Sequence, residues 1–383
     1  MKKILQILNS YIPAYKFGGA NKLMYEYAKL LNDKYDIVVF TTDVKNDYER
    51  ITKKEQKKYN KKFKIRYFYN IFPYLSSRYN ITFSVTLWFN VIKNFKNYDY
   101  IHICEIRGIL PFIVTLMSIL NNKIILIHSS FGMLSSKPSN LLKKYLIKIY
   151  DKIFLKLLIK RIDIALCESK QEIEQYRKYN YKKKCVIVPH VVDEFKNKVC
   201  KKEYLFSKKK INILFLGRLH KNKGVINAIK FVKILHSIDN SYTLSIVGND
   251  EGDLGNIKHY IEKNNIGNFV QILSPIYGNK RFCLYNEAKF FILLPIVNLE
   301  TSLASIEALS QNCFIIFNNN SYIENAETSF AGVNIDNFIS MKEAALYIHN
   351  NIKNIGTKPF EYFRKYNSRK QIKKLLVKEI FCS

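Results

Sequence analysis

The stretch INILFLGRLHKNKG, residues 211–224, decides the fold of this chain, because it joins a strand to the start of a helix. Its largely apolar segment, Ile211 to Leu216, has the length of a buried strand. A polar turn follows at Gly217-Arg218, and a helix is expected from about Gly224. Short apolar strands that alternate with helices are typical of a parallel sheet, because parallel strands need a long crossover connection.

The same alternation continues toward the carboxyl terminus. Helices are expected at about residues 253–264 and near residues 304–310. The predicted strands are short apolar runs: Leu244–Val247, Phe269–Leu273, Phe290–Leu294 and Phe314–Phe317. This half of the chain therefore predicts a doubly wound sheet, which carries helices on both faces.

The chain before residue 211 has a similar pattern. The loop Phe17-Gly18-Gly19-Ala20 precedes apolar residues that recur at helical spacing up to Leu31. The predicted strands are Ile4–Leu8, Ile37–Thr41, Tyr100–Ile103, Lys123–Ile127, Ile164–Cys167 and Val186–Val188. The sequence thus predicts an α/β protein with two sheets.

With 383 residues, the chain is too long for one ordinary core. Residues 193–210 are charged, contain seven lysines and lack a clear period, which is typical of a linker. We expect an N-terminal domain over residues 1–195, a linker over 196–210, a C-terminal domain over 211–357, and a helical segment over 358–383 that crosses back to the N-terminal domain.

The net charge is strongly positive, with 62 Lys and Arg against 31 Asp and Glu, or +31. Such a charge favours anionic partners, which include nucleic acid, acidic lipid headgroups and phosphorylated substrates. The abundance of Lys, Asn, Ile and Tyr is also typical of AT-rich coding sequence, in which lysines simply cover solvated faces. No nucleic-acid motif is visible, so we expect no nucleic-acid partner.

Neither a signal peptide nor a membrane-spanning segment is predicted. The longest apolar run, Ile109 to Leu120, contains Pro111 and is shorter than the roughly 20 residues that span a bilayer. We therefore expect a cytoplasmic protein. The seven cysteines are scattered, without a Cys-x-x-Cys pair, so we expect reduced thiols and no metal site.

A basic stretch over residues 143–161 has lysine at every fourth position from Lys144 to Lys160. This spacing puts the lysines beside Leu, Ile and Phe on one slowly drifting helical face. Two interpretations remain open. The stretch is either a helix on an anionic membrane surface, at the inner face of the membrane, or an ordinary helix whose apolar side packs on the sheet.

Ligands of parallel sheets bind where strands end and helices begin, because free backbone N–H groups and the helix dipole attract anions there. Gly19 and Gly248 each follow a predicted strand. After the strand that ends at Leu216, Arg218 and Lys223 could clamp a diphosphate from two sides. The alternatives are tight turns for the glycines and ordinary surface positions for the two cations.

Further polar candidates lie at other strand ends. Glu300 and Glu307 flank the start of a predicted helix, where carboxylates can accept hydrogen bonds from sugar hydroxyls. His128 follows a predicted strand and could donate to a sugar or phosphate oxygen, whereas His102 is a weaker candidate. Each could equally be a structural residue.

These pieces together resemble glycosyltransferase family 4, the retaining GT-B enzymes, over nearly the full length of the chain. The matching pieces occur in the family's order: the Gly18-Gly19-Ala20 loop, Ile127-His128-Ser129, Val188-Pro189-His190-Val191-Val192-Asp193, Gly217-Arg218 with Lys223-Gly224, Val247-Gly248, and the Glu300 to Glu307 region. The resemblance implies two Rossmann-like domains that face a cleft.

The resemblance also implies roles for individual residues. Arg218 and Lys223 would bind the phosphates of a nucleotide-sugar donor, Glu307 the ribose, and Glu300 the transferred sugar. His128 would lie beside the reacting sugar. The implied catalytic residues are His128, Arg218, Lys223 and Glu300. The implied donor-binding residues are Gly19, Gly217, Arg218, Lys223, Gly248, Ser302, Leu303 and Glu307.

Two departures from the family pattern stand out. Six residues separate Glu300 from Glu307, whereas the family usually has seven, so Glu300 is shifted by one position. His190-Val191 replaces the Asn-Gly that usually precedes the linker, which changes a turn.

The expected function is transfer of a hexose-type sugar, with retention, to a glycan or lipid-linked acceptor for cell-surface polysaccharide or glycolipid synthesis. We expect no cofactor and no metal, since cationic side chains and backbone N–H groups can neutralise the leaving diphosphate. The alternatives are a GT-B epimerase or phosphorylase, a non-catalytic sugar-nucleotide-binding protein, and a nucleic-acid-binding protein suggested only by charge.

Overall fold

The computed structural model describes all but a few short stretches of the chain. The residues outside the description are Tyr15, Lys16, Gly18, Asn80, Ile81, residues 135–140, residues 193–204, Lys208, Tyr277, Glu300, Thr301, Tyr322, Cys382 and Ser383. Most of the predicted linker, 196–210, therefore lies outside the described residues. The chain divides into an N-terminal unit, Met1–Val191 with Ile372–Ser383, and a C-terminal unit, Val192–Gln371.

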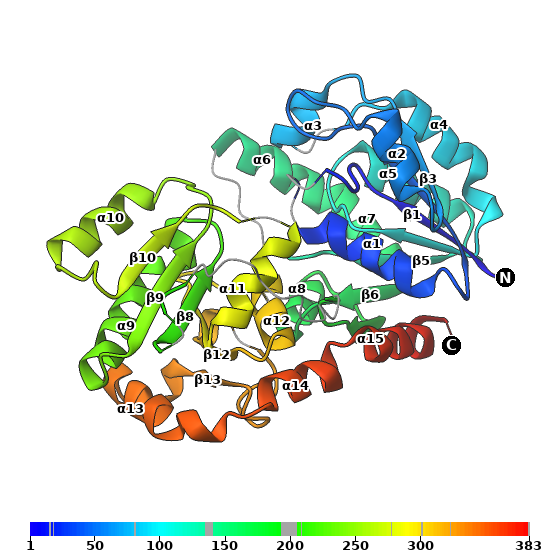
Figure 1. Ribbon diagram of the computed structural model, residues 1–383. Coiled ribbons are helices and arrows are strands. Elements are labelled where there is room, and N and C mark those ends of the chain that lie inside the picture. The colour runs from blue at the N-terminus through cyan, green and yellow to red at the C-terminus, as the bar shows by residue number, and fades with distance from the viewer. Residues whose placement is uncertain are drawn as a thin grey trace. The chain divides into compact units, whose positions relative to one another are not determined.

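Seven strands form the sheet of the N-terminal unit, in the order β3-β2-β1-β4-β5-β6-β7 (Figure 1). Their bounds are β1 (Lys3–Ile7), β2 (Asp36–Thr42), β3 (Lys64–Phe68), β4 (Tyr100–Ile103), β5 (Ile125–Ser129), β6 (Ile164–Cys167) and β7 (Lys184–Ile187). All neighbouring strands run parallel, which confirms the predicted parallel sheet. β3 was not predicted.

Successive strand residues of this sheet enter different cores, because side chains alternate between the two faces of a strand. Ile4 packs in one core and Leu5 in the other. The first core includes residues of α1 (Gly19–Leu31) and α15 (Arg369–Leu376), and the second includes residues of α4 (Val85–Asn94), α5 (Ile109–Leu120) and α7 (Lys156–Arg161). Ile372 and Leu376, near the end of the chain, thus complete the core begun by the first strand.

The remaining helices of this unit lie at its connections. They are α2 (Lys53–Tyr59), α3 (Pro73–Tyr79), α6 (Leu141–Tyr150), a π-helical segment (Asp151–Leu155) and α8 (Lys170–Lys178). The basic stretch 143–161 is helical, as predicted, and runs from α6 through the π-helical segment into α7.

The sheet of the C-terminal unit has six parallel strands in the order β10-β9-β8-β11-β12-β13 (Figure 1). Their bounds are β8 (Ile211–Leu216), β9 (Tyr242–Val247), β10 (Val270–Leu273), β11 (Phe290–Leu293), β12 (Phe314–Phe317) and β13 (Gly332–Asn334). The helices are α9 (Val225–Ile238), α10 (Leu254–Lys263), α11 (Arg281–Glu287), α12 (Leu303–Ser310), α13 (Met341–Asn351) and α14 (Lys358–Tyr366).

Both sheets contain the strand order of a Rossmann fold, in which the winding reverses beside the first strand of the sheet. In the C-terminal unit the reversal lies at β8, which pairs with β9 on one side and with β11 on the other. Ligands of doubly wound sheets bind at such a switch point, outside the carboxyl ends of the strands. The turn after β8 occupies this position.

Two expectations about composition can be compared with the structure. Within the described residues, no helix combines the length and apolar character that crossing a bilayer requires. Cys104, Cys167, Cys185 and Cys313 are free thiols. Cys283, however, is disulfide-bonded, so the expectation of uniformly reduced cysteines was wrong.

Candidate functional site

The carboxyl ends of β8 and β9 are in direct backbone contact at Gly217 and Gly248. A Cβ atom at Gly248 would lie 1.6 Å from the carbonyl oxygen of Gly217, so no other residue fits there without movement. The Gly217 N–H donates to the carbonyl of Val247 at 3.0 Å, and the Leu219 N–H donates to that of Asn249 at 2.7 Å. These contacts fix the course of the turn that carries Arg218.

Gly224 ends this turn and begins α9, in the left-handed conformation with φ of 68°. A Cβ atom there would lie 1.8 Å from the carbonyl oxygen of Leu294. The Ile296 N–H donates to the carbonyl of Asn222 at 3.0 Å, which also joins this turn to the chain after β11. The backbone from Gly217 to Gly224 is therefore held against the ends of both strands that neighbour β8.

Two predicted phosphate-binding cations lie on this turn. Arg218 has a 64% exposed side chain, and its Nη1 is 2.9 Å from Oε2 of Glu251, in the turn that follows β9. Burial lowers the pKa of Lys223, the positive charge of Arg218 lowers it further, and Glu251 raises it. Arg218, Lys223 and Glu251 therefore form one cluster of interacting charges. Sequence reasoning missed Glu251, which is 33 residues from Arg218.

Glu307 lies on α12 and is buried, with both carboxylate oxygens bonded to one arginine. Nε of Arg281 is 2.7 Å from Oε2 of Glu307, and Nη2 is 2.5 Å from Oε1. The hydroxyl of Tyr285 lies 3.4 Å from Oε2 of the same carboxylate. A planar guanidinium bonded to both oxygens is the strong form of this interaction, and it fixes the orientation of the carboxylate. Arg281 was not predicted.

The remaining donor-binding candidates of this unit surround the start of α12. Ser302 is the N-cap residue of α12, where its side chain makes no capping hydrogen bond, and Leu303 is the first residue of the helix. The Ser305 N–H donates to the Ser302 carbonyl at 3.0 Å. Glu300 lies outside the described residues, so its predicted contact with a sugar stays a prediction.

In the N-terminal unit, His128 is fully buried near the end of β5. Its Nδ1 is 2.6 Å from the hydroxyl of Tyr176, and its Nε2 is 3.3 Å from the carbonyl oxygen of Glu105. Burial lowers the pKa of His128 to about 4, so the ring is neutral at physiological pH. His102, on the neighbouring β4, is also buried and lies 2.8 Å from the hydroxyl of Ser129.

Sequence reasoning also missed two buried carboxylates in this unit, those of Glu105 and Glu172. Oε1 of Glu105 accepts a hydrogen bond from the Asn9 N–H at 2.5 Å, and burial raises the pKa of Glu105 to about 7. Glu172 accepts hydrogen bonds from the Ser130 hydroxyl, from the Gly132 N–H at 3.0 Å and from the Glu168 N–H at 2.7 Å. Burial also raises the pKa of Glu172.

Gly19 is the first residue of α1, and a Cβ atom there would meet nothing within 4 Å. Among the described residues, therefore, nothing packs against this position, unlike at Gly248. The Asn21 side chain donates to the Ser10 hydroxyl at 3.0 Å, which ties the start of α1 to the chain after β1. The start of the helix thus has an open backbone beside the end of a strand.

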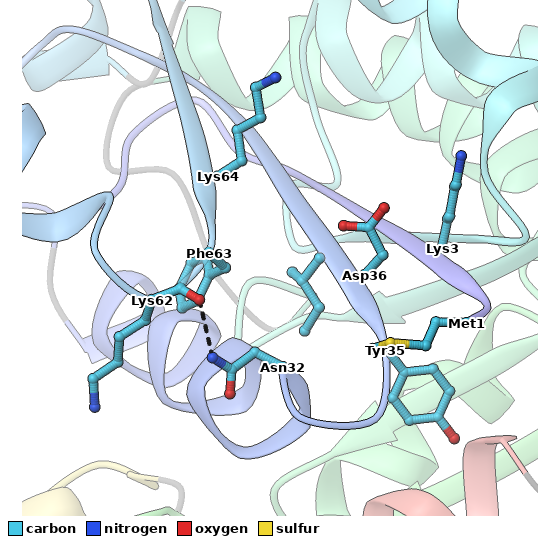
Figure 2. Close-up of a pocket in the computed structure, with 9 residues that line it drawn as sticks. Met1, Lys3, Asn32, Tyr35, Asp36, Lys62, Phe63 and Lys64 are labelled. Atoms are coloured by element: carbon cyan, nitrogen blue, oxygen red, sulfur yellow. Dashed lines mark hydrogen bonds between the residues drawn. The ribbon is translucent and has the colours of Figure 1, made fainter.

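A hollow of about 480 Å³ lies at the opposite edge of the N-terminal sheet (Figure 2). Lys3, Asp36 and Lys64, the first residues of β1, β2 and β3, line it. Figure 2 shows Asn32 donating a hydrogen bond to the carbonyl of Lys62, at 3.1 Å. None of the predicted site residues lines this hollow.

The structure thus brings part of the predicted site together within the C-terminal unit. Gly217, Arg218, Lys223 and Gly248 form one turn system in the C-terminal unit. Gly19 and His128 belong to the N-terminal unit. Among the described residues, no three His, Cys, Asp or Glu side chains are grouped in a way that could hold a metal ion.

Both halves of the chain match known protein families. Residues 17–194 match the family described as Glycosyltransferase Family 4, and residues 196–370 match the family described as Glycosyl transferases group 1. A search of curated proteins finds no match.

Several solved structures share the fold. HepE from Anabaena in complex with UDP has a TM-score of 0.70 at 12% identity, with 100% of both chains covered. A glycosyltransferase from Rickettsia africae has a TM-score of 0.62 at 16% identity, covering 99% of this chain and 94% of that one. WaaG, a glycosyltransferase involved in lipopolysaccharide biosynthesis, has a TM-score of 0.61 at 14% identity, covering 99% of this chain and 100% of that one.

The two family matches are consecutive and together span nearly the whole chain. The two Rossmann-like sheets correspond to the same two segments. The chain therefore belongs to the family 4 glycosyltransferases, group 1, and its fold is the GT-B fold.

Proposed function

We propose that this glycosyltransferase transfers a hexose-type sugar from a nucleoside-diphosphate sugar to a hydroxyl of a glycan or lipid-linked acceptor, with retention of configuration. Its products would belong to cell-surface polysaccharide or glycolipid synthesis. The observation that carries the proposal is the cation pair Arg218 and Lys223 on the rigid turn after β8. Support also comes from HepE, a protein of the same fold whose structures contain UDP and UDP-glucose.

In this proposal, the charge cluster after β8 binds the diphosphate. Arg218 is exposed and paired with Glu251, and a pair of this kind contributes only about 0–1 kcal/mol. A diphosphate can therefore displace Glu251 at little cost. It would also favour the charged form of the partly buried Lys223, whose pKa is lowered by burial and by Arg218.

In this proposal, Glu307 binds the ribose of the donor while Arg281 holds the carboxylate in place. Two bonds from Arg281 fix the orientation of the carboxylate, and carboxylate oxygens can accept hydrogen bonds from ribose hydroxyls. Ser302 and Leu303 would offer the start of α12 to the donor, and Glu300 would contact the transferred sugar. Gly217, Gly248 and Gly19 would let the backbone approach the donor closely.

The proposed reaction needs no metal or other cofactor. As the bond from the anomeric carbon to the diphosphate oxygen breaks, negative charge grows on the diphosphate, where Arg218 and Lys223 neutralise it. The acceptor hydroxyl attacks the anomeric carbon from the face that the diphosphate leaves, and it gives its proton to the departing phosphate. Both nitrogens of His128 have partners, so a sugar contact at Nε2 would replace the 3.3 Å contact with the Glu105 carbonyl.

The test combines donor screening with two site variants and a matched control. Nucleotide sugars are screened by thermal stabilisation, since a ligand that binds only the folded state raises the midpoint. Arg218→Ala and Lys223→Ala should abolish this stabilisation and lower turnover by orders of magnitude. Lys221→Ala removes an exposed cation from the same turn and should change neither the thermal stabilisation by nucleotide sugars nor the turnover.

The outcomes separate the proposal from its alternatives. Full activity in either site variant would contradict the phosphate clamp. Nucleotide-sugar binding by calorimetry without any product would favour the non-catalytic sugar-nucleotide-binding protein, and absence of any such binding would contradict the proposal. A product without a new glycosidic bond would favour an epimerase or phosphorylase. Nuclear magnetic resonance of the product's anomeric centre tests retention directly.

A further inference from the structure

Three neighbouring helices of the N-terminal unit carry large apolar side chains on their outer faces. Leu87 of α4, Val114 of α5 and Leu158 of α7 pack in one core, on the same side of the sheet. α5 contacts both α4 and α7. The outer sides of these helices therefore lie next to one another on a single face of the unit.

The outer sides are apolar where a solvated helix would be polar. α5 contains no charged residue, and its residues Leu116, Ile119 and Leu120 are exposed. We give the name lipid face to the outer apolar residues of α4, of α5 and of the continuous segment from α6 through the π-helical segment into α7. They are Val85, Phe89 and Ile92 of α4; Leu116, Ile119 and Leu120 of α5; Tyr145 and Ile149 of α6; Ile153 of the π-helical segment; and Leu157 of α7. Phe89 is 62%, Leu120 76% and Tyr145 65% exposed. An apolar grouping of this kind marks an interaction site.

The basic stretch keeps its apolar and basic residues in line over several turns. Tyr145, Ile149, Ile153 and Leu157 recur every four residues, and each step of four overshoots an α-helical turn of about 3.6 residues. The π-helical segment Asp151–Leu155 compensates, because one of its turns holds more than four residues. The π-helical segment therefore counters the drift that a continuous α-helix would show.

Specific contacts hold this segment against α5. Arg107, just before α5, makes a bidentate ion pair with Asp151, with both nitrogen-to-oxygen distances at 2.8 Å. The Tyr150 hydroxyl donates to the carbonyl of Gly108 at 3.0 Å, and the rings of Phe112 and Phe154 stack edge to face at 4.8 Å. The exposed side chains on both helices are thus presented by a rigid support.

The charged residues of these helices are almost all basic. The segments 85–94, 109–120 and 141–161 contain eight Lys or Arg and a single acidic residue, Asp151, which is paired with Arg107. Lys148, Lys152 and Lys156 are exposed directly beside Ile149, Ile153 and Leu157. In a symmetric dimer through this face the lysines of both copies would meet, which is unfavourable. An anionic surface suits the lysines and an apolar interior suits their neighbours.

We infer that the lipid face docks on an anionic bilayer, with its apolar side chains inserted among the acyl chains and its lysines on the headgroups. This arrangement is that of an interfacial helix, extended over three helices. This inference deepens the proposed function, because an enzyme docked on the membrane would bind a lipid-linked acceptor directly at the bilayer surface. The docking itself depends only on the lipid face and does not require donor binding.

The test measures partitioning of the full chain onto vesicles of phosphatidylcholine, with and without phosphatidylglycerol. Phe89→Ser, Leu120→Ser and Ile153→Ser combined should lower partitioning at least tenfold. Lys148→Gln, Lys152→Gln and Lys156→Gln combined should lower it on the order of a hundredfold, at about fivefold per lysine. The matched controls alter exposed residues of the C-terminal unit: Ile339→Ser, Leu346→Ser and Tyr347→Ser combined, and Lys209→Gln, Lys230→Gln and Lys263→Gln combined.

The single tryptophan of the chain, Trp88, supplies a second measurement, because it lies on α4 next to Phe89. Brominated acyl chains should quench its fluorescence on anionic vesicles and not in solution. No binding to either vesicle, or binding that the apolar variants leave unchanged, would overturn the inference. The inference would also be overturned if the protein did not bind vesicles but formed concentration-dependent dimers that the apolar variants abolish. Nucleotide-sugar stabilisation, measured on each variant, reports separately on the proposed function.

Discussion

The guanidinium of Arg281 bonds to both carboxylate oxygens of Glu307, at 2.7 Å and 2.5 Å, and joins the start of α11 to the middle of α12. The carboxylate is buried, and Arg281 supplies positive charge at both of its oxygens. Removing one partner of a buried ion pair leaves an uncompensated charge, which typically costs about 3–5 kcal/mol.

Arg281→Ala should therefore destabilise the protein by about 3 kcal/mol or more and, on the proposed function, weaken donor binding. Urea unfolding measures the first effect and calorimetry the second. Lys280→Ala removes the exposed cation next to Arg281 and serves as the control, with an expected change within about 0.5 kcal/mol. Equal effects of the two substitutions would contradict a specific role for the pair.

Gly248 and Gly19 predict opposite results for the same substitution. Gly248→Ala places a methyl group 1.6 Å from the Gly217 carbonyl and should cost about 1–3 kcal/mol or more through forced backbone movement. Gly19→Ala meets no atom within 4 Å and should leave the thermal midpoint almost unchanged. If turnover nevertheless falls in Gly19→Ala, the open backbone at the start of α1 serves a ligand. Unchanged turnover in this variant would remove Gly19 from the site.

The contact between Arg218 and Glu251 predicts a variant with stronger donor binding. Glu251→Gln removes the carboxylate that competes with a diphosphate for Arg218. An exposed pair contributes at most about 1 kcal/mol, so the dissociation constant of the donor should fall by up to about fivefold. Titration calorimetry at low salt checks this, and weaker binding in the variant would contradict the displacement of Glu251.

Glu105 predicts a dependence of stability on pH. Burial raises the pKa of Glu105 to about 7 in the folded protein, so folding favours the protonated carboxyl. Its contribution to stability is complete below the unfolded pKa of about 4.3 and is lost as the pH rises through 7. The Glu105→Gln variant has no ionisable group at this position, so it lacks this pH-dependent contribution.

The free energy of unfolding of the native protein should therefore fall relative to Glu105→Gln between about pH 4 and pH 7.5, by a few kcal/mol. Comparing the two proteins at each pH separates Glu105 from His102 and His128, whose pKa values are lowered by burial. Parallel stability curves for the two proteins would show that the Glu105 carboxyl does not titrate in this range.

Much of the fold could be predicted because the strands at the centre of each sheet are buried on both faces. The run from Phe290 to Leu293 is apolar throughout, and in Ile211 to Leu216 only Asn212 interrupts the apolar residues. β3 escaped prediction because it is an edge strand, in which Lys64 and Arg66 interrupt the apolar residues. β13 escaped because it has only three residues, Gly332 to Asn334.

The cations of the candidate site could be predicted, but their partners could not. Arg218 and Lys223 lie within one turn, where spacing along the chain reflects spacing in the structure. Glu251 lies in the turn after β9, 33 residues from Arg218, and Arg281 is the first residue of α11, 26 residues from Glu307. Contacts between the ends of different strands depend on strand order, and no local pattern encodes that order.

The position of α15 has a consequence for how the protein is made. Ile372 and Leu376 pack in the same core as Ile4, although nearly the whole chain separates Ile4 from them in the sequence. On the ribosome, the C-terminal sheet has all its described strands once residue 334 has emerged, whereas the N-terminal sheet, which is synthesised earlier, still lacks α15, the last α-helix to pack in one of its two cores. The half synthesised first is therefore the half finished last, and until then its uncovered apolar face is available to chaperones.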